Sequence, residues 1–453
     1  MKILNRKKSS IETQWIYALI GELCEIVTGN TPSKKESENY GDFIPFVKPP
    51  ELTNSLINCS DDNLSRIGVK KARILPINSI LVSCIGSLGK VGMNSVPVAF
   101  NQQINAIKPS PMFLSKFLFY QAQSYEFKIQ LDTLASATTL PIVNKGKFAT
   151  ITVKLPPLPE QHRIVAKIEE LFSELDSGIE SLKKVQEQLK TYRQAVLKYA
   201  FEAKLTNQVE NNELPKRWKI KKLGESLNIV SGSTPKGIND IQSSGEIPFY
   251  KVGDMNTHGN EVYMKKANLN LTQDEVNSLK VKLFPKGTVI FPKRGGAILT
   301  NKKRILSSFS GFDLNLMGAI PNENIDGLYL YYWFQKLNLS KIYDGSNVPQ
   351  INKKNIAPLD IPIPPINEQY AIVSEIESRL SVCDKIEQTV EDSLKKAEVL
   401  RQSILKKAFA GELTRDWREK HPELITGENS AEKLLERIKT EKEKTRSKKA
   451  KKK

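Results

Sequence analysis

Apolar residues recur every three or four positions in two long stretches, Pro159 to Lys204 and Asn367 to Ala410, with no proline after the first residue. This spacing predicts two long helices that pair along a coiled-coil seam. The alternative, two amphipathic helices that each pack on a separate globule, remains open. The predicted seam residues are Ile164, Ile168, Leu171, Leu175, Ile179, Leu182, Val185, Leu189, Tyr192, Val196 and Tyr199, and then Ile372, Ile376, Leu380, Cys383, Ile386, Val390, Leu394, Ala397, Leu400 and Ile404.

The two stretches are versions of one sequence. "LPPLPEQHRIVAKIEELF" begins at Leu155 and "IPPINEQYAIVSEIESRL" at Ile363, and 18 of the 52 positions aligned from there are identical. The repeat also precedes the helices, because "WIYALIGELCEIVTGNTP" from Trp15 matches "WKIKKLGESLNIVSGSTP" from Trp218. The segments between these matches share only fragments. A similar frame therefore surrounds two divergent interiors.

Each interior alternates apolar runs, such as "SILVSCIG" and "GTVIFPKRGG", with Gly, Pro and Asn, and then continues into a helical run. This pattern predicts an α/β (mixed α+β) fold: two globular domains joined by two long helices that form an antiparallel coiled coil, with an internal pseudo-twofold repeat. We expect a first globule over 1–156, a central helix over 157–206, a second globule over 207–364, a C-terminal helix over 365–415 and an extension over 416–453.

The net charge is +18, and the last twelve residues contribute eight positive charges and one negative, so +11 remains in the body of the chain. A body this basic favours a polyanionic partner, with nucleic acid first. No apolar run is long enough to span a membrane, and four dispersed cysteines without a CxxC pair fit a reducing compartment. We therefore expect a cytoplasmic protein without a zinc ribbon.

Sequence patterns of catalysis are missing. "GSLGKVG" lacks the spacing of a phosphate-binding loop, the three histidines are isolated, and no dinucleotide-binding glycine motif follows a strand. We expect no catalytic residue, no metal site and no cofactor bound by this chain.

Polar and basic loops stand at matched places in both globules. Lys and Arg can contact phosphates, while Gln, Asn, Ser, Thr and Arg can contact base edges. We expect Arg294 to reach a guanine and Lys293 a phosphate; for each residue taken alone, an ordinary solvated loop is the alternative. The candidate DNA-binding residues are Lys34, Lys35, Lys48, Ser87, Lys90, Gln102, Gln103, Thr138, Thr139, Lys236, Lys251, Lys293, Arg294, Asn347 and Gln350.

The whole chain resembles the specificity subunit of a type I restriction–modification enzyme. The resemblance rests on the Pro-Pro-x-x-Glu-Gln junctions, on "RQAVLKYAFEAKLT" and "RQSILKKAFAGELT" at the helix ends, and on the extension that follows, which is most similar to the enterobacterial type IA group. One departure is "ETQW" before the first globule, where the second has "LPKRW"; it leaves the role of residues 1–14 open.

The resemblance implies a non-catalytic, DNA-binding subunit whose globules are target recognition domains, each reading one half of a split double-stranded DNA site. Two methyltransferase subunits that bring S-adenosylmethionine would dock along the helices, and one or two restriction and translocation subunits would use ATP and Mg. A basic coiled-coil scaffold without sequence preference is the alternative from another class. The candidate partner-binding residues are Glu160, Gln161, Arg193, Gln194, Glu368, Gln369, Arg401 and Gln402.

Overall fold

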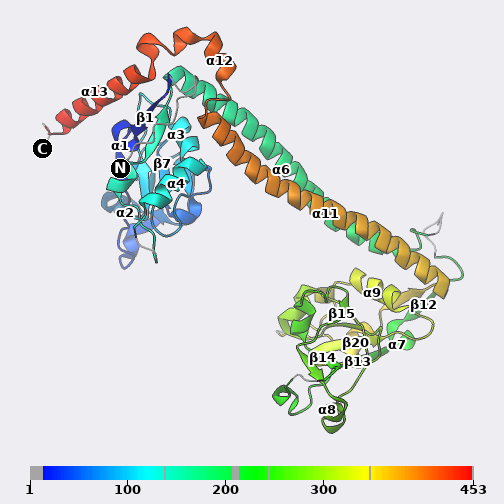
Figure 1. The fold of residues 1–453 in the computed structure, drawn as a ribbon. Helices are drawn as coiled ribbons and strands as arrows, with labels where there is room; N and C mark the ends of the chain where they lie inside the picture. The colour runs from blue at the N-terminus through cyan, green and yellow to red at the C-terminus, as the bar shows by residue number, and fades with distance from the viewer. Residues whose placement is uncertain (1–13, 137–138, 207–213, 243–244, 346–347, 451–453) are drawn as a thin grey trace. The chain divides into compact units, whose positions relative to one another are not determined.

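The computed structural model describes residues 14–136, 139–206, 214–242, 245–345 and 348–450. The chain divides into two compact units, one made of 1–182 with 392–453 and the other of 183–391. Each unit contains a sheet-rich globule together with part of both long helices (Figure 1). No described helix is long and apolar enough to cross a membrane.

The first globule is built on a five-stranded sheet with the order β2-β10-β7-β8-β4 and a four-stranded sheet with the order β5-β3-β9-β6. A separate antiparallel pair, β1 with β11, closes the globule at its sequence ends. The strands are β1 (Ile16–Leu19), β2 (Ile26–Thr28), β3 (Tyr40–Val47), β4 (Leu56–Ile57), β5 (Asn63–Leu64), β6 (Ile74–Leu75), β7 (Ile80–Ser83), β8 (Val91–Asn94), β9 (Val98–Phe100), β10 (Ile104–Ile107) and β11 (Thr152–Leu155). The helices are α1 (Ile20–Leu23), α2 (Arg66–Lys71), α3 (Ser115–Ala122), α4 (Tyr125–Leu134) and α5 (Lys145–Ala149).

The second globule repeats this plan. Its five-stranded sheet has the order β13-β20-β17-β18-β15, a three-stranded sheet has the order β16-β14-β19, and β12 pairs with β21 as β1 pairs with β11. The strands are β12 (Lys219–Lys222), β13 (Asn228–Ser231), β14 (Ile247–Tyr250), β15 (Tyr263–Met264), β16 (Leu269–Leu271), β17 (Val289–Pro292), β18 (Arg304–Leu306), β19 (Gly311–Phe312), β20 (Leu316–Ile320) and β21 (Asp360–Ile363). The helices are α7 (Leu223–Ser226), α8 (Gln273–Ser278), α9 (Gly327–Lys336) and α10 (Lys353–Ile356). The predicted mixed α/β class is confirmed.

The two long helices are α6 (Leu158–Ala200) and α11 (Ile366–Phe409), and both contribute to each unit. In the first unit the Arg401 guanidinium pairs with Asp176, and in the second Arg193 Nη2 lies 2.6 Å from Asp384 Oδ1. Residue numbers rise along one helix as they fall along the other. In the first unit Lys154 Nζ, just before α6, also donates to the carbonyl of Phe409, the last residue of α11, at 3.0 Å, so the helices are antiparallel, as predicted.

The seam differs from the prediction at four positions. Tyr192, Tyr199, Ile386 and Leu400 are 44%, 45%, 40% and 50% exposed. The half-buried residues next to three of them are Arg193, Glu387 and Arg401, and the buried Ala200 follows Tyr199. At these positions the residue that faces the other helix is the next one along the chain. Apolar spacing could not predict this, because the arginines that face the seam pair with carboxylates of the other helix: Arg193 contacts both Asp384 and Glu387.

Each long helix is joined to its globule by a glutamate and a buried glutamine in its first turn, and the glutamate is buried in the first unit and half-buried in the second. In the first unit Trp15 Nε1 donates to Glu160 Oε2 at 2.8 Å, and in the second Trp218 Nε1 donates to Glu368 Oε2 at 2.9 Å. The neighbouring Gln161 accepts from the amide of Leu114 at 3.1 Å and donates to the carbonyl of Pro156 at 2.9 Å.

The C-terminal extension completes the first of these junctions. It contains α12 (Arg415–Lys420) and α13 (Ala431–Ala450), and Leu434 and Ile438 of α13 are buried in the core of the first unit. The Arg418 guanidinium contacts the Glu160 carboxylate, which also accepts from Thr414 Oγ1 at 2.8 Å.

The second junction has an arginine of different origin. Arg217, directly before Trp218, pairs with Glu368, with side chains 53% and 23% exposed, whereas Arg418 and Glu160 are 7% and 0% exposed. Gln14 stands at the equivalent place before Trp15. The extension therefore supplies the guanidinium that the first frame lacks.

We predict that Arg418→Ala destabilises the first unit, because it leaves the buried Glu160 carboxylate without its cation. Breaking such a buried pair costs about 3–5 kcal/mol. Amide hydrogen exchange in β1 and β11 measures the opening free energy of this frame. The matched control is Arg217→Ala read in β12 and β21, where the exposed pair should contribute much less; equal losses in the two frames would contradict the prediction.

Candidate nucleic-acid interface

Four loops of the first unit form one continuous row at the ends of strands β2, β9 and β7. They are Gly29–Thr31, Asn101–Gln103, Cys84–Gly86 and Pro141–Val143. Backbone hydrogen bonds join them in this order: Gly29 N to Ile104 O at 3.2 Å, Asn30 N to Phe100 O at 3.0 Å, Cys84 N to Gln103 O at 2.7 Å, Val143 N to Cys84 O at 2.8 Å and Gly86 N to Pro141 O at 3.0 Å. We call this set the loop row.

The second unit builds the same loop row from Gly232–Thr234, Asp313–Asn315, Lys293–Gly295 and Pro349–Ile351. The equivalent hydrogen bonds are Gly232 N to Leu316 O at 3.1 Å, Ser233 N to Phe312 O at 3.1 Å, Lys293 N to Asn315 O at 2.8 Å, Ile351 N to Lys293 O at 2.9 Å and Gly295 N to Pro349 O at 2.8 Å. The backbone is shared by the two globules, although most of the side chains on it differ.

A glycine makes each loop row possible. A Cβ built on Gly29 would lie 2.1 Å from the carbonyl oxygen of Asn101, and one on Gly232 would lie 2.0 Å from that of Asp313. No side chain tolerates such an approach to a backbone oxygen, so only glycine lets the two loops cross. This explains why "TGNTP" and "SGSTP" keep their glycine.

The first loop row includes Gln102 and Gln103, which were predicted to bind DNA. Gln102 is exposed and accepts from Thr31 Oγ1, whereas half-buried Gln103 accepts from Asn101 Nδ2 at 2.9 Å. Ser87 and Thr139 are exposed and flank the row.

The other candidates of the first unit lie on or beyond its neighbouring loops. Lys34 and Lys35 are exposed beyond the loop that starts at Gly29, and Lys90 is exposed at the end of the loop that follows β7. Lys48 forms an ion pair with Asp62. Thr138 lies outside the described residues.

In the second unit Arg294, Lys293 and Gln350 lie on the loop row. Arg294 is exposed and pairs with Gln350 in an isolated antiparallel bridge; Ile85 and Ile142 form the equivalent bridge in the first unit. Lys236 is exposed after the Gly232 loop, and Lys251 Nζ donates to Asn239 Oδ1 at 2.7 Å. Asn347 lies outside the described residues.

Lys293 does not have the exposed ammonium that a phosphate contact needs. Only 8% of its surface is exposed, and its Nζ donates to Ser231 Oγ at 3.0 Å. Burial first, and then the charge of Arg294, lower the pKa of Lys293 below its usual value. The geometry favours a supporting role beneath Arg294 in place of the expected phosphate contact.

The basic run after Arg294 also contains cations that point inward. Lys303 is fully buried, and its Nζ donates to Asn301 Oδ1 and to the carbonyl of Leu337, both at 2.7 Å. Burial lowers the pKa of Lys303 to about 7. Lys303 therefore anchors the loop to the end of α9 and offers no exposed charge to a ligand.

The sequence reasoning missed several residues of the loop row. Asp313 is buried beside Asn315, whose Nδ2 donates to it at 3.0 Å, and burial raises the pKa of the Asp313 carboxyl. Leu140 and Val348 occupy matched places beside the row and are 51% and 68% exposed. Exposed apolar side chains at matched positions were a usable signal, because such groups can contact the methyl group of thymine.

The candidate partner-binding residues lie at the helix ends. Glu160, Gln161 and Gln369 have no exposed surface, so the structure assigns them to the internal junctions described above. Gln194 is exposed, and Arg193 and Arg401 are half-buried in their ion pairs. Gln402 Nε2 donates to the carbonyl of Gln123 at 3.3 Å.

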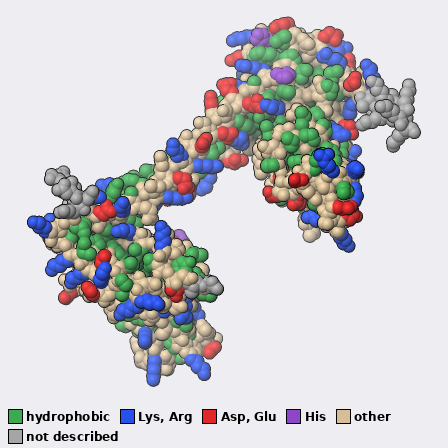
Figure 2. Space-filling model, turned by 180° about the vertical axis from the view of Figure 1, so that it is seen from behind, with side chains coloured by type: hydrophobic (Ala, Val, Ile, Leu, Met, Phe, Trp, Pro, Cys, Tyr) green, Lys and Arg blue, Asp and Glu red, His purple; other side chains and the backbone are tan. Residues whose placement is uncertain are grey.

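Charge alone does not mark the interface. Figure 2 shows Lys and Arg side chains spread over the visible face of both globules and interleaved with Asp and Glu. Within the described part of the chain, no three His, Cys, Asp or Glu side chains come together as metal ligands. The repeated loop row is therefore the stronger indication of a binding site.

Comparisons with known proteins identify the family. Residues 13–191 and 215–396 match the type I restriction modification DNA specificity domain. The specificity subunit of the type I restriction enzyme EcoDI of Escherichia coli is 28% identical over 97% of this chain and 98% of its own length. That of StySPI from Salmonella potsdam is 26% identical over 97% of both chains.

Solved structures share the fold. A chain from a type I R-M system, described in terms of complex assembly and conformational transition, is 19% identical, covers 88% of this chain and 98% of its own, and has a TM-score of 0.68. The HsdS subunit from Thermoanaerobacter tengcongensis is 18% identical, covers 88% of this chain and 97% of its own, and has a TM-score of 0.54. With the family match over most of its length, this chain belongs to the DNA specificity subunits of type I restriction–modification systems.

Proposed function

We propose that the chain reads the two halves of a split double-stranded DNA site, one with each globule. The observation that carries this proposal is the loop row, which has one backbone in both units and different side chains at equivalent places. Ile85 in the first unit corresponds to Arg294 in the second, and Ile142 corresponds to Gln350. Different side chains on one scaffold are what two unlike half-sites require.

The domain assignment follows from the same repeat. Residues 1–156 and 207–364 are the proposed target recognition domains, and 157–206 and 365–415 the helices that hold the half-sites at a fixed spacing. Unbroken α6 and α11, paired with each other in both units, support this ruler role. The remaining residues, 416–453, form the extension that completes the first globule's junction.

The chemistry belongs to partner subunits in this proposal. Two methyltransferase subunits carry S-adenosylmethionine and methylate an adenine in each half-site, and one or two restriction and translocation subunits add ATP- and Mg-dependent cleavage. The specificity subunit itself is non-catalytic and acts in the cytoplasm. The names of the relatives, all specificity subunits of restriction enzymes, support this division of labour.

Methylation of genomic DNA tests the function. The purified chain with S-adenosylmethionine should transfer no methyl group, whereas addition of the methyltransferase subunit of the same system should methylate adenines at one split motif. Sequencing of the methylated DNA gives both half-sites and the spacer. Methyl transfer by the chain alone would contradict the proposal, and binding without sequence preference would favour the scaffold alternative.

We predict that Arg294→Ala relaxes sequence preference at one position of the half-site read by the second unit. Arg294 is exposed on the loop row, and a bidentate contact to guanine is worth about 1–3 kcal/mol of discrimination. Binding of the chain–methyltransferase complex to duplexes changed at single base pairs measures it. The control is Lys286→Ala, which removes an exposed cation before the opposite end of strand β17 and should leave the sequence preference unchanged. An unchanged preference in Arg294→Ala would show that this loop is an ordinary solvated loop.

We predict that Gly232→Ala weakens recognition of the same half-site and spares the other. The new methyl group would force the Gly232 loop away from Asp313, and overpacking of this kind costs about 1–3 kcal/mol. The same duplex panel, changed in one half-site at a time, measures the loss. Gly296→Ala is the matched control, since no atom outside its own turn of the chain lies within 4 Å of its Cβ position. Wild-type binding by Gly232→Ala would show that the loop row is not the interface.

A further inference from the structure

The sequence of the C-terminal helix changes sharply in charge. Residues 431–443 contain four Lys or Arg and four Glu residues, so their net charge is zero, whereas residues 444–453 contain seven Lys or Arg and no acidic residue. We call residues 444–453 the basic segment; it carries +7 of the net charge of +18. Lys444 at its start is exposed. A neutral stretch is therefore followed directly by a purely cationic one.

The change in charge falls just after the contacts that attach α13 to the first globule. Ile438 is buried in the core of the first unit, and Lys439 Nζ lies 3.3 Å from Glu22 Oε1. Lys442 Nζ donates to the carbonyl of Cys24 at 3.0 Å, and the two residues that follow Lys442 are exposed. The globule thus fixes the helix immediately before the basic segment begins.

The attached part of α13 lies close to the loop row of the first unit. Strand β2 leads from Cys24 to Gly29 of the row, and these five residues span at most about 18 Å. Lys145, two residues after the last loop of the row, lines a hollow of about 570 Å³ together with Lys442. Ten helical residues are about 15 Å long. The basic segment is therefore long enough to contact a ligand that lies on the loop row.

Helix stability does not account for seven cations. One or two cations in the last turn of a helix interact favourably with its dipole, but the effect is confined to that turn. Lys444 and Lys448 stand four residues apart on α13, a spacing at which like charges destabilise a helix. A polyanion would remove this repulsion, and the phosphate backbone of DNA is the polyanion that the proposed function supplies.

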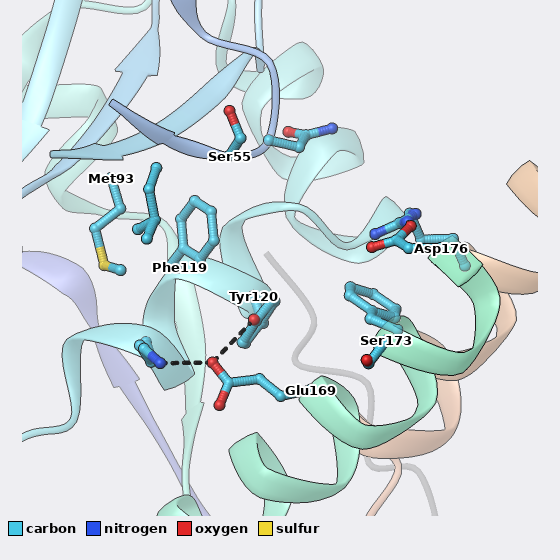
Figure 3. A pocket seen from close by; sticks show the side chains of 12 residues that line it. Ser55, Met93, Phe119, Tyr120, Glu169, Ser173 and Asp176 are labelled. Atoms are coloured by element: carbon cyan, nitrogen blue, oxygen red, sulfur yellow. Dashed lines mark hydrogen bonds and ion pairs between the residues drawn. The ribbon is translucent and has the colours of Figure 1, made fainter. Parts of the chain in front are cut away.

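The other side of the first unit offers no comparable charge. Figure 1 shows α13 and α6 on opposite sides of the first globule. Where the globule meets α6, a hollow of about 390 Å³ contains cations that are already paired: Lys116 Nζ lies 2.7 Å from Glu169 Oε1, and the Arg401 guanidinium pairs with Asp176 (Figure 3). The α13 side is thus the more favourable one for phosphates.

We propose that the basic segment binds the phosphate backbone of the DNA duplex just outside the half-site read by the first globule. This inference rests on the proposed function, because the loop row places the DNA and α6 runs toward the spacer. Contacts from lysine and arginine to phosphates carry no sequence information, so the segment adds affinity without preference. The repeat supplies it once, since residues 207–217, which follow the first copy, contain two cations and two carboxylates.

Glutamine in place of all seven cations of the basic segment tests the proposal. Each phosphate contact contributes about 0.9 to the slope of log affinity against log salt concentration, so the slope should become shallower by up to about six. Binding to motif-containing and random duplexes should weaken by the same factor. Equilibrium binding of the chain–methyltransferase complex at several salt concentrations measures both quantities. The control has arginine in place of the six lysines, keeps the charge and should bind as the wild type does.

The length of the duplex locates the contact. The glutamine variant should bind more weakly than the wild type to duplexes that extend about ten base pairs, or roughly 34 Å, beyond the first half-site. The two proteins should bind equally to duplexes that stop at that half-site and extend only beyond the second. Sequencing of the methylated DNA gives the two half-sites, and the first is the one whose recognition Gly232→Ala spares.

Three results would overturn the inference: an unchanged salt slope in the glutamine variant, an equal loss of affinity at both flanks, or a changed sequence preference. A wild-type complex without any sequence preference would instead overturn the proposed function. The salt slope on random duplexes still tests the basic segment in that case, so the two failures can be told apart.

Discussion

The rest of the structure depends on a carboxylate at the start of each long helix, which is buried in the first unit and half-buried in the second. Glu160 accepts from the Trp15 indole and Glu368 from the Trp218 indole, so each helix is tied to the first strand of its globule. A buried carboxylate is costly unless donors surround it, which makes this geometry restrictive. The adjacent glutamine, with bonds to loop amides and carbonyls, fixes the first helical turn in the same place. The frame of the repeat is therefore constant because its buried polar groups leave few substitutions open.

In each junction an arginine pairs with the glutamate of the long helix, and the two arginines come from different parts of the chain. Arg217 lies directly before Trp218, and its ion pair with Glu368 is partly exposed. Arg418 lies in the extension, and its ion pair with Glu160 is buried. The extension is also fixed at its far end, where Lys442 Nζ donates to the carbonyl of Cys24 at 3.0 Å at the end of α1. The departure of "ETQW" from "LPKRW" is thus compensated within the same unit.

Sequence alone predicted the repeat, the mixed α/β class and the antiparallel helices, because these follow from apolar spacing and from proline positions. It could not predict the register, since Arg193 and Arg401 enter the seam and displace Tyr192 and Leu400 toward solvent. It also treated every lysine of a polar loop as available. Lys293 and Lys303 are buried, because local composition does not show which side of a loop faces the core.

In the proposed function, the loop row lets a specificity subunit change its DNA preference without a change of fold. Its backbone hydrogen bonds depend on a glycine at one crossing and on the strand ends beneath it, whereas its side chains carry little of the structure. Ile85 and Arg294 occupy the same backbone position, one apolar and one cationic, and both sheets remain intact. Buried polar groups restrict the frame, so variation can accumulate on the loop row, where we propose that side chains contact DNA. This difference between the restricted frame and the variable loop row accounts for the sequence pattern, in which similar segments flank two divergent interiors.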